Sequence, residues 1–176
     1  MNILVTGSPG SGKTTLVRAV IDELQKNNVK GGGFYTKEMR IGNTRTGFSL
    51  VTLGGASATL AQVGIRSSHK VGKYGVDTGV LDGIGVEAIK SAMAGSDFIV
   101  IDEIGKMELL SPLFIKSVGE ALDDRKVLLA TIGKFKHPFA DEVRQRTDVC
   151  LFEIDRGDQD RLRTKIINLI LKSLEE

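Results

Sequence analysis

Short, mainly apolar runs alternate along the chain with segments whose apolar residues recur every third or fourth position. The runs occupy residues 3–5, 98–101, 127–131 and 149–154. Such runs are typical of strands that are covered on both faces of a parallel sheet. The alternation therefore predicts an α/β fold with a mainly parallel sheet and helices on both of its faces.

Five segments have the apolar spacing of helices that bury one face. The first is expected to run from about Lys13 to Asn27, and the second from Val86 to Gly95, with Gly95 as the candidate C-cap. The third begins at Ser111, a candidate N-cap that is followed by proline. The last two are expected at residues 138–146 and after Asp158, which is a candidate N-cap.

Between the first two helices the pattern changes to that of an antiparallel hairpin. Residues 34–39 and 48–53 are extended runs, and Gly42 and Asn43 lie between them in a turn. We expect this hairpin to add to an otherwise parallel sheet. Residues 54–85 are rich in glycine and serine and have no clear period, which predicts a long irregular segment.

The strongest chemical signal directly follows the first apolar run. Residues 7–14 read GSPGSGKT and match the phosphate-binding loop G-x-x-x-x-G-K-[ST], or Walker A motif. In such a loop Lys13 spans the β- and γ-phosphates, the Thr14 hydroxyl holds Mg²⁺, and the following helix N-terminus favours anions. The alternative is a glycine-rich turn that binds nothing. The predicted nucleotide-binding residues of the loop are Gly7, Ser8, Pro9, Gly10, Ser11, Gly12, Lys13, Thr14 and Thr15.

A second element, the Walker B candidate, ends the run 98–101 with two carboxylates, Asp102 and Glu103. Asp102 is predicted to hold Mg²⁺ opposite Thr14, and Glu103 to orient or deprotonate the attacking water, so Lys13 and Glu103 are the candidate catalytic residues. Alternatively, Glu103 only caps a turn or pairs with Lys106. Thr131 ends the next run, either as a polar sensor of the γ-phosphate or simply as the end of a strand.

Phosphoryl transfer also needs a further cation. Lys106, Arg40, Arg45, Arg66 and Lys73 are candidates, and the sequence does not choose among them. No Asn-Lys-x-Asp run is present to recognise guanine, so selectivity for the base is expected to be weak.

Length and charge narrow the class of protein. The 176 residues are expected to form a single domain, 1–176, and 24 lysines and arginines against 22 acidic residues leave a formal charge of +2, so no nucleic-acid partner is expected. No apolar stretch is long enough to span a membrane, and a cytoplasmic location is expected. The single cysteine, Cys150, lies in an apolar run and is expected to be buried.

These motifs together resemble a known family over nearly the whole chain. GSPGSGKTTL, the hairpin sequences GGFYTKEMR and TRTGFSLV, VGKYGVD, and above all IDEIGKMELLS with a following phenylalanine are similar to the thermophile-type nucleoside-triphosphatases, which have a human relative called cancer-related nucleoside-triphosphatase. The resemblance implies a monomeric phosphate-loop fold and slow, Mg²⁺-dependent hydrolysis of several nucleoside triphosphates to diphosphate and phosphate. It assigns residues 7–14 to phosphate, and Asp102 with Glu103 to metal and water. Residues 131–135, TIGKF, depart from the proline-containing stretch expected in relatives.

Hydrolysis of ATP, GTP, CTP and UTP is thus the predicted function. A small-molecule or nucleotide kinase can use the same loop, with an acceptor pocket and arginine-bearing lid within residues 56–85. A nucleotide-dependent switch, or binding module, is the other alternative.

Overall fold

The computed structural model describes residues 1–155 and 157–175, in which nine strands form one sheet. The strands follow the order β5-β6-β4-β3-β2-β7-β8-β1-β9. Their bounds are β1 Asn2–Thr6, β2 Gly31–Ile41, β3 Thr44–Thr52, β4 Ser57–Gln62, β5 Lys70–Val71, β6 Tyr74–Val76, β7 Phe98–Ile104, β8 Val127–Ile132 and β9 Val149–Glu153.

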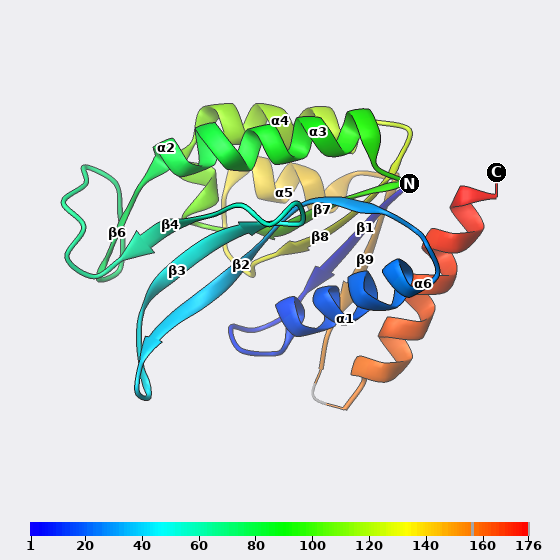
Figure 1. The fold of residues 1–176 in the computed structure, drawn as a ribbon, viewed down its shortest axis with the longest axis horizontal. Coiled ribbons are helices and arrows are strands. Elements are labelled where there is room, and N and C mark those ends of the chain that lie inside the picture. The colour runs from blue at the N-terminus through cyan, green and yellow to red at the C-terminus, as the bar shows by residue number, and fades with distance from the viewer. Residues whose placement is uncertain (156, 176) are drawn as a thin grey trace.

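Helices cover both faces of the parallel part of the sheet (Figure 1). One face packs against α3, α4 and α5, and the other against α1 and α6. The predicted α/β architecture is confirmed. The helical bounds are α1 Lys13–Lys26, α2 Thr78–Val80, the π-helical turn η1 Leu81–Gly85, α3 Val86–Gly95, the 3₁₀ turn η2 Glu108–Leu110, α4 Pro112–Leu122, α5 Pro138–Gln145 and α6 Gln159–Leu174.

The long strand β2 joins the parallel and antiparallel parts of the sheet. Residues 31–35 pair with β7 in parallel, and residues 34–41 pair with β3 as an antiparallel hairpin. The predicted hairpin is therefore confirmed. Gly33 is required within β2, because its φ is 111° and a Cβ there would lie 2.0 Å from the Val100 carbonyl oxygen.

The prediction of an irregular segment over residues 54–85 is wrong. This stretch forms β4, β5 and β6, which extend the sheet beyond the hairpin, and then α2 and η1, which lead directly into α3. The strands are short and their few apolar residues, such as Leu60 and Val76, are fully buried. A short strand with few apolar residues gives no clear period in the sequence.

Three smaller expectations also fail. Gly95 is the last residue of α3, and the C-cap is Ser96 in an extended conformation. Asp158 occupies the N-cap position of α6, but its side chain makes no capping hydrogen bond and instead pairs with Arg161 at 3.4 Å. Cys150 is exposed, because it lies on β9 at the edge of the sheet.

The parallel register brings the predicted site residues to one edge of the sheet. Strand β8 lies between β1 and β7, and Ile132 at its end pairs with Thr6 on one side and Ile104 on the other. The loop after β1 and the Asp-Glu pair on β7 therefore meet at the carboxyl ends of these strands, where ligands bind in open α/β sheets.

Candidate functional site

The loop between β1 and α1 has the backbone that its glycines predict. Gly10 and Gly12 have φ values of 76° and 95°, a region that residues with a Cβ rarely adopt. At Gly7 the requirement is space, since a Cβ would lie 2.6 Å from the Ser11 Oγ and 3.1 Å from the Ile154 carbonyl oxygen. The chain can thus wrap closely around a ligand at the N-terminus of α1.

Lys13, the first residue of α1, directs its ammonium group back into this loop. Its Nζ donates to the carbonyl oxygens of Gly7 at 3.1 Å and Ser8 at 3.3 Å, and the residue is 8% exposed. No carboxylate among the described residues forms an ion pair with it. The charge is therefore held at the place where the motif predicts phosphate.

Asp102 is fully buried at the end of β7. Its Oδ1 accepts a hydrogen bond from the Thr131 hydroxyl at 2.5 Å, whereas its Oδ2 has no partner among the described residues. Burial raises the pKa of this carboxyl to about 6, although the hydrogen bond from Thr131 and the nearby hydroxyl of Thr14 act in the opposite direction. A buried carboxylate oxygen without a partner is costly, and a cation is one group that can satisfy it.

The surroundings of Asp102 fit the way in which proteins hold Mg²⁺. Mg²⁺ is usually bound by one or two carboxylates, waters and the phosphates of the substrate rather than by a complete protein cage. Asp102 and the neighbouring Thr14 hydroxyl supply oxygen ligands of this kind. Within residues 1–155 and 157–175, no cluster of three or more His, Cys, Asp or Glu side chains is arranged to hold a metal.

Glu103 lies beside Asp102, where the ladder between β7 and β8 is interrupted after Ile101. Its Oε1 lies close to two glycines, 2.7 Å from the position of a Cβ on Gly105 and 3.7 Å from that on Gly133. Burial raises the pKa of the carboxyl, while the charge of Lys13 lowers it. In the described part of the chain Glu103 forms neither an ion pair with Lys106 nor a side-chain hydrogen bond that caps a turn, so neither alternative explanation is supported.

Thr131 is fully buried near the end of β8. Its hydroxyl donates to Asp102, so its contact in this structure is with the candidate metal ligand. This contact engages Oδ1 of Asp102, whereas Oδ2 has no partner among the described residues.

The candidate cations differ in whether an acidic side chain pairs with them. Arg40 and Arg45 both pair with Glu38, at 2.7 and 3.0 Å, and Arg45 also donates to the Tyr74 hydroxyl at 3.1 Å. Both guanidinium groups are thus held by one carboxylate of the hairpin, which offsets one of their two positive charges. For Arg66 and Lys73, no acidic partner is present among the residues that the structure describes.

Two further basic side chains lie against the segment after β8. Lys106 lies over the Phe135 ring at 6.0 Å, and Arg144 lies over the same ring at 5.8 Å. Arg144 also pairs with Asp141 at 2.8 Å and donates to the carbonyl oxygens of Gly133 and Phe135, which fixes this loop. The sequence analysis did not consider Arg144, because only folding brings α5 back to the loop.

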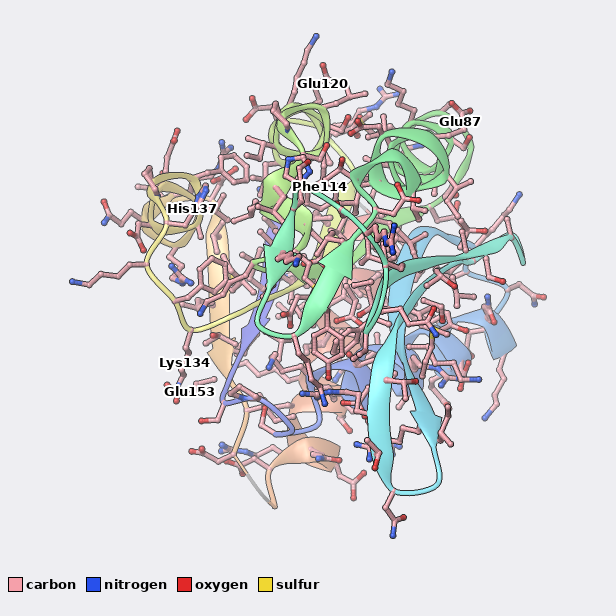
Figure 2. The ribbon with its side chains drawn as sticks, turned by 90° about the vertical axis from the view of Figure 1, so that its left-hand side faces the viewer. Glu87, Phe114, Glu120, Lys134, His137 and Glu153 are labelled. Atoms are coloured by element: carbon pink, nitrogen blue, oxygen red, sulfur yellow. The ribbon has the colours of Figure 1, made fainter. Side chains whose placement is uncertain are left out.

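Three labelled side chains in Figure 2, Lys134, His137 and Glu153, lie near the segment after β8. Lys134, in the segment that follows β8, forms an ion pair with Glu153 at the end of β9, while His137 lies at the start of α5 (Figure 2). Lys134 is therefore also compensated by an acidic side chain.

One buried acidic residue of the site was missed by the sequence analysis. Glu108, in η2, is 5% exposed, and burial together with the charge of Glu103 raises the pKa of its carboxyl to about 8. The available signal was the sequence DEIGKMEL, in which Glu108 is the third carboxylate.

A phosphate-binding loop between a buried strand and a helix, with an Asp-Glu pair at the end of a parallel strand, defines a phosphate-loop NTPase fold. Comparison with known proteins identifies the family. A sequence profile of the family described as NTPase matches residues 2–167, and the chain belongs to that family.

Individual relatives match this chain over almost their whole lengths. The chain is 42% identical to nucleoside-triphosphatase THEP1 of Thermotoga maritima over 97% of this chain and 95% of that protein. It superposes on the crystal structure of THEP1 from Aquifex aeolicus with a TM-score of 0.88 and 33% identity, covering 97% and 99% of the two chains. A solution structure of a human cancer-related nucleoside triphosphatase gives a TM-score of 0.82 and 34% identity, with 98% of each chain covered.

No helix in the described part of the chain is long and apolar enough to cross a membrane.

Proposed function

We propose that this protein hydrolyses nucleoside triphosphates to nucleoside diphosphates and phosphate with the help of Mg²⁺. The observation that supports this most directly is the convergence of three groups from two elements. Lys13 at the start of α1 and the pair Asp102 and Glu103 near the end of β7 meet at the carboxyl edge of the sheet, where the Lys13 charge opposes the rise that burial causes in the pKa of both carboxyls. The family and the names of its relatives agree with this activity.

Binding of the phosphates is assigned to the loop and to Lys13. In the nucleotide complex the Lys13 ammonium would leave the carbonyl oxygens of Gly7 and Ser8 and meet the β- and γ-phosphates. The backbone N–H groups of residues 7–14 supply further donors at the positive end of α1. This arrangement compensates the charge that spreads over the phosphate oxygens in the transition state.

Thr14 and Asp102 would hold the Mg²⁺, with the unpartnered Oδ2 of Asp102 as a ligand, either directly or through water. The ion neutralises charge on the phosphates when it is bound. Thr131 keeps the carboxylate in place through its hydrogen bond to Oδ1.

Glu103 is proposed to orient the attacking water and accept its proton. Burial raises the pKa of Glu103, and a more basic carboxylate is a better proton acceptor near neutral pH. Lys13 opposes this shift, which favours the ionised form that a general base requires.

The proposed substrates include ATP, GTP, CTP and UTP. A guanine-reading Asn-Lys-x-Asp sequence does not occur in the chain, so the triphosphate is the main recognised group.

Phosphate release in the absence of any acceptor tests this function. Wild-type protein with Mg²⁺ and each triphosphate should release free phosphate. Glu103→Gln should bind Mg²⁺-triphosphate nearly as well as wild type, yet hydrolyse it more slowly in single turnover, on the order of a hundred- to ten-thousandfold. Glu120→Gln is the matched control, because Glu120 is on α4, on the outside of the molecule (Figure 2).

Each contrary result has a defined meaning. Tight binding without phosphate release by wild type would indicate a switch, and transfer only to an added acceptor would indicate a kinase. Full activity of Glu103→Gln would move water activation to another residue, and loss of nucleotide binding would place Glu103 among the metal ligands.

A further inference from the structure

A polar cavity lies outside the site described above, in the antiparallel part of the sheet. Its volume is about 560 Å³, and it is lined by residues 64–68, which follow β4, and by residues 70, 73 and 75 of the β5–β6 hairpin. Arg66, Lys70 and Lys73 are among these lining residues, and none of the described residues that line the cavity is acidic. The cavity is therefore positively charged.

The cavity lies toward the same edge of the sheet as the phosphate loop. β2 is parallel to β7, and the β2–β3 and β3–β4 pairs are both antiparallel, so β4 runs in the direction of β7. The segment that follows β4 thus begins at the carboxyl edge. Because β4 is three strands from β7, the two strands lie about 14 Å apart along the sheet, with β6 at the far left of Figure 1. The cavity is therefore separate from the proposed triphosphate site.

Hydrogen bonds and close packing fix the backbone around the cavity. The Ser67 hydroxyl donates to the Val76 carbonyl oxygen at 2.7 Å and accepts from the His69 N–H at 3.0 Å. The Val76 N–H in turn donates to the His69 carbonyl oxygen at 2.9 Å. At Gly75 a Cβ would lie 2.1 Å from the Ile65 carbonyl oxygen, so glycine is needed for the loop to pack against β6. These contacts hold the loop and β6 together as the walls of one cavity.

The three cations of the cavity have no acidic partner in the part of the chain that the structure describes. Acidic side chains on neighbouring elements have other contacts. Glu38, on β2, pairs with Arg40 and Arg45, and Asp77, directly after β6, accepts from the Gly79 N–H. Since like charges around one cavity repel each other, an anion between them would be attracted by all three.

A phosphomonoester group has the chemistry that matches this cavity. It carries about two negative charges at neutral pH and several oxygens that accept hydrogen bonds. The guanidinium of Arg66 can donate to two of these oxygens at once, while Lys70 and Lys73 supply point charges and Ser68 a hydroxyl donor. A volume of about 560 Å³ is typical of pockets for small molecules, so the group would be part of an organic ligand.

We propose that this cavity is a second ligand site, which binds the phosphomonoester group of a small molecule such as a nucleoside monophosphate or a sugar phosphate. Arg66, Lys70 and Lys73 hold the phosphate oxygens. Arg66 and Lys73 therefore have a role other than that of the further cation in phosphoryl transfer. The proposal does not rest on triphosphate hydrolysis, because none of these residues is assigned to the phosphate loop, the metal or the attacking water.

A titration followed by two-dimensional ¹H–¹⁵N NMR tests the proposal, because the resonances of each site report on that site alone. The probes are AMP, glucose 6-phosphate, adenosine and glucose, added to nucleotide-free protein without Mg²⁺. At least one phosphomonoester should shift the amide resonances of residues 64–75 to saturation, whereas adenosine and glucose should not. Saturation by AMP alone would identify a nucleoside monophosphate, and saturation by glucose 6-phosphate alone a sugar phosphate. Resonances of residues 7–14 report separately on the phosphate loop.

Charge-removing variants then assign the binding to the cavity. Arg66→Gln and Lys73→Gln should each weaken binding of the phosphomonoester by about tenfold, because each removes a charge-assisted hydrogen bond. The double variant should weaken it by about a hundredfold. Both side chains belong to exposed residues, so the fold should be unaffected. Lys116→Gln is the matched control, since it removes the same charge from an exposed position on α4 and should keep the wild-type dissociation constant.

Three results would overturn the proposal. One is the absence of a saturating shift in residues 64–75 with either phosphomonoester at millimolar concentration. Another is an equal affinity of wild type and the Arg66→Gln/Lys73→Gln double variant, which would place the ligand outside the cavity. The third is an equal response to adenosine or glucose, which would show that the phosphate is not recognised. Absence of phosphate release from ATP would instead refute the proposed function and leave this titration unchanged.

Discussion

The buried Glu108 should make the stability of the protein fall as the pH rises. Burial raises the pKa of its carboxyl from 4.5 to about 8, so over this interval the folded state binds a proton that the unfolded state has lost. The contribution of Glu108 to the free energy of unfolding is fully present below the unfolded-state pKa. It is lost as the pH rises through the folded-state pKa.

The magnitude follows from the number of protons. A difference of one bound proton changes the free energy of unfolding by at most about 1.4 kcal/mol for each pH unit. The glutamine in Glu108→Gln does not titrate. The free energy of unfolding of this variant, minus that of wild type, should therefore rise by up to about 1.4 kcal/mol for each pH unit between pH 5 and 8.

Urea denaturation of both proteins at pH 5, 6, 7 and 8, without nucleotide or metal, measures this difference. The comparison cancels groups that titrate alike in the two proteins, such as Asp148, whose pKa is lowered mainly by Arg146. Glu120→Gln should give a curve parallel to wild type. A difference between Glu108→Gln and wild type that stays constant with pH would show that Glu108 ionises normally, and the reasoning would be wrong.

Three further predictions concern the nucleotide site. Lys13→Ala should abolish triphosphate hydrolysis because it removes the cation that we propose bridges the β- and γ-phosphates, and a phosphate-release rate near that of wild type would refute the phosphate-loop assignment. Thr14→Ala should weaken Mg²⁺-dependent nucleotide binding without unfolding α1, since alanine favours helix; an unchanged Mg²⁺ titration would contradict the metal role. The kcat/KM values for ATP, GTP, CTP and UTP should lie within about a hundredfold of each other, because a missing base contact costs only a few kcal/mol, and a strict preference would reveal a base reader.

The central strands could be predicted from the sequence because their residues are buried on both faces. Phe98 to Ile101 are all fully buried in β7, so an unbroken apolar run was sufficient. The strands β4 to β6 could not be recognised in this way. They are short, and residues such as Leu60 and Tyr74 become core only when the hairpin supports them.

In the site, too, contiguous motifs could be predicted from the sequence, whereas contacts that form only on folding could not. The loop of residues 7–14 is contiguous, so its spacing alone identified it. Whether Arg45 is paired depends on Glu38, and the two side chains meet only because β2 and β3 pair in the hairpin. Burial of Glu108 likewise depends on how η2 packs against β7 and α4, so the sequence DEIGKMEL shows a third carboxylate without indicating that it is buried.

The two contacts of the Lys13 ammonium with its own loop have a consequence for how nucleotide binds. Because Nζ donates to the carbonyl oxygens of Gly7 and Ser8, the loop itself holds the ammonium group at the place where phosphate is proposed to bind. In the proposed complex, binding of a triphosphate would be an exchange in which phosphate oxygens replace these two carbonyls as acceptors. Little conformational entropy is lost in such an exchange, so most of the attraction between the charges remains available for binding.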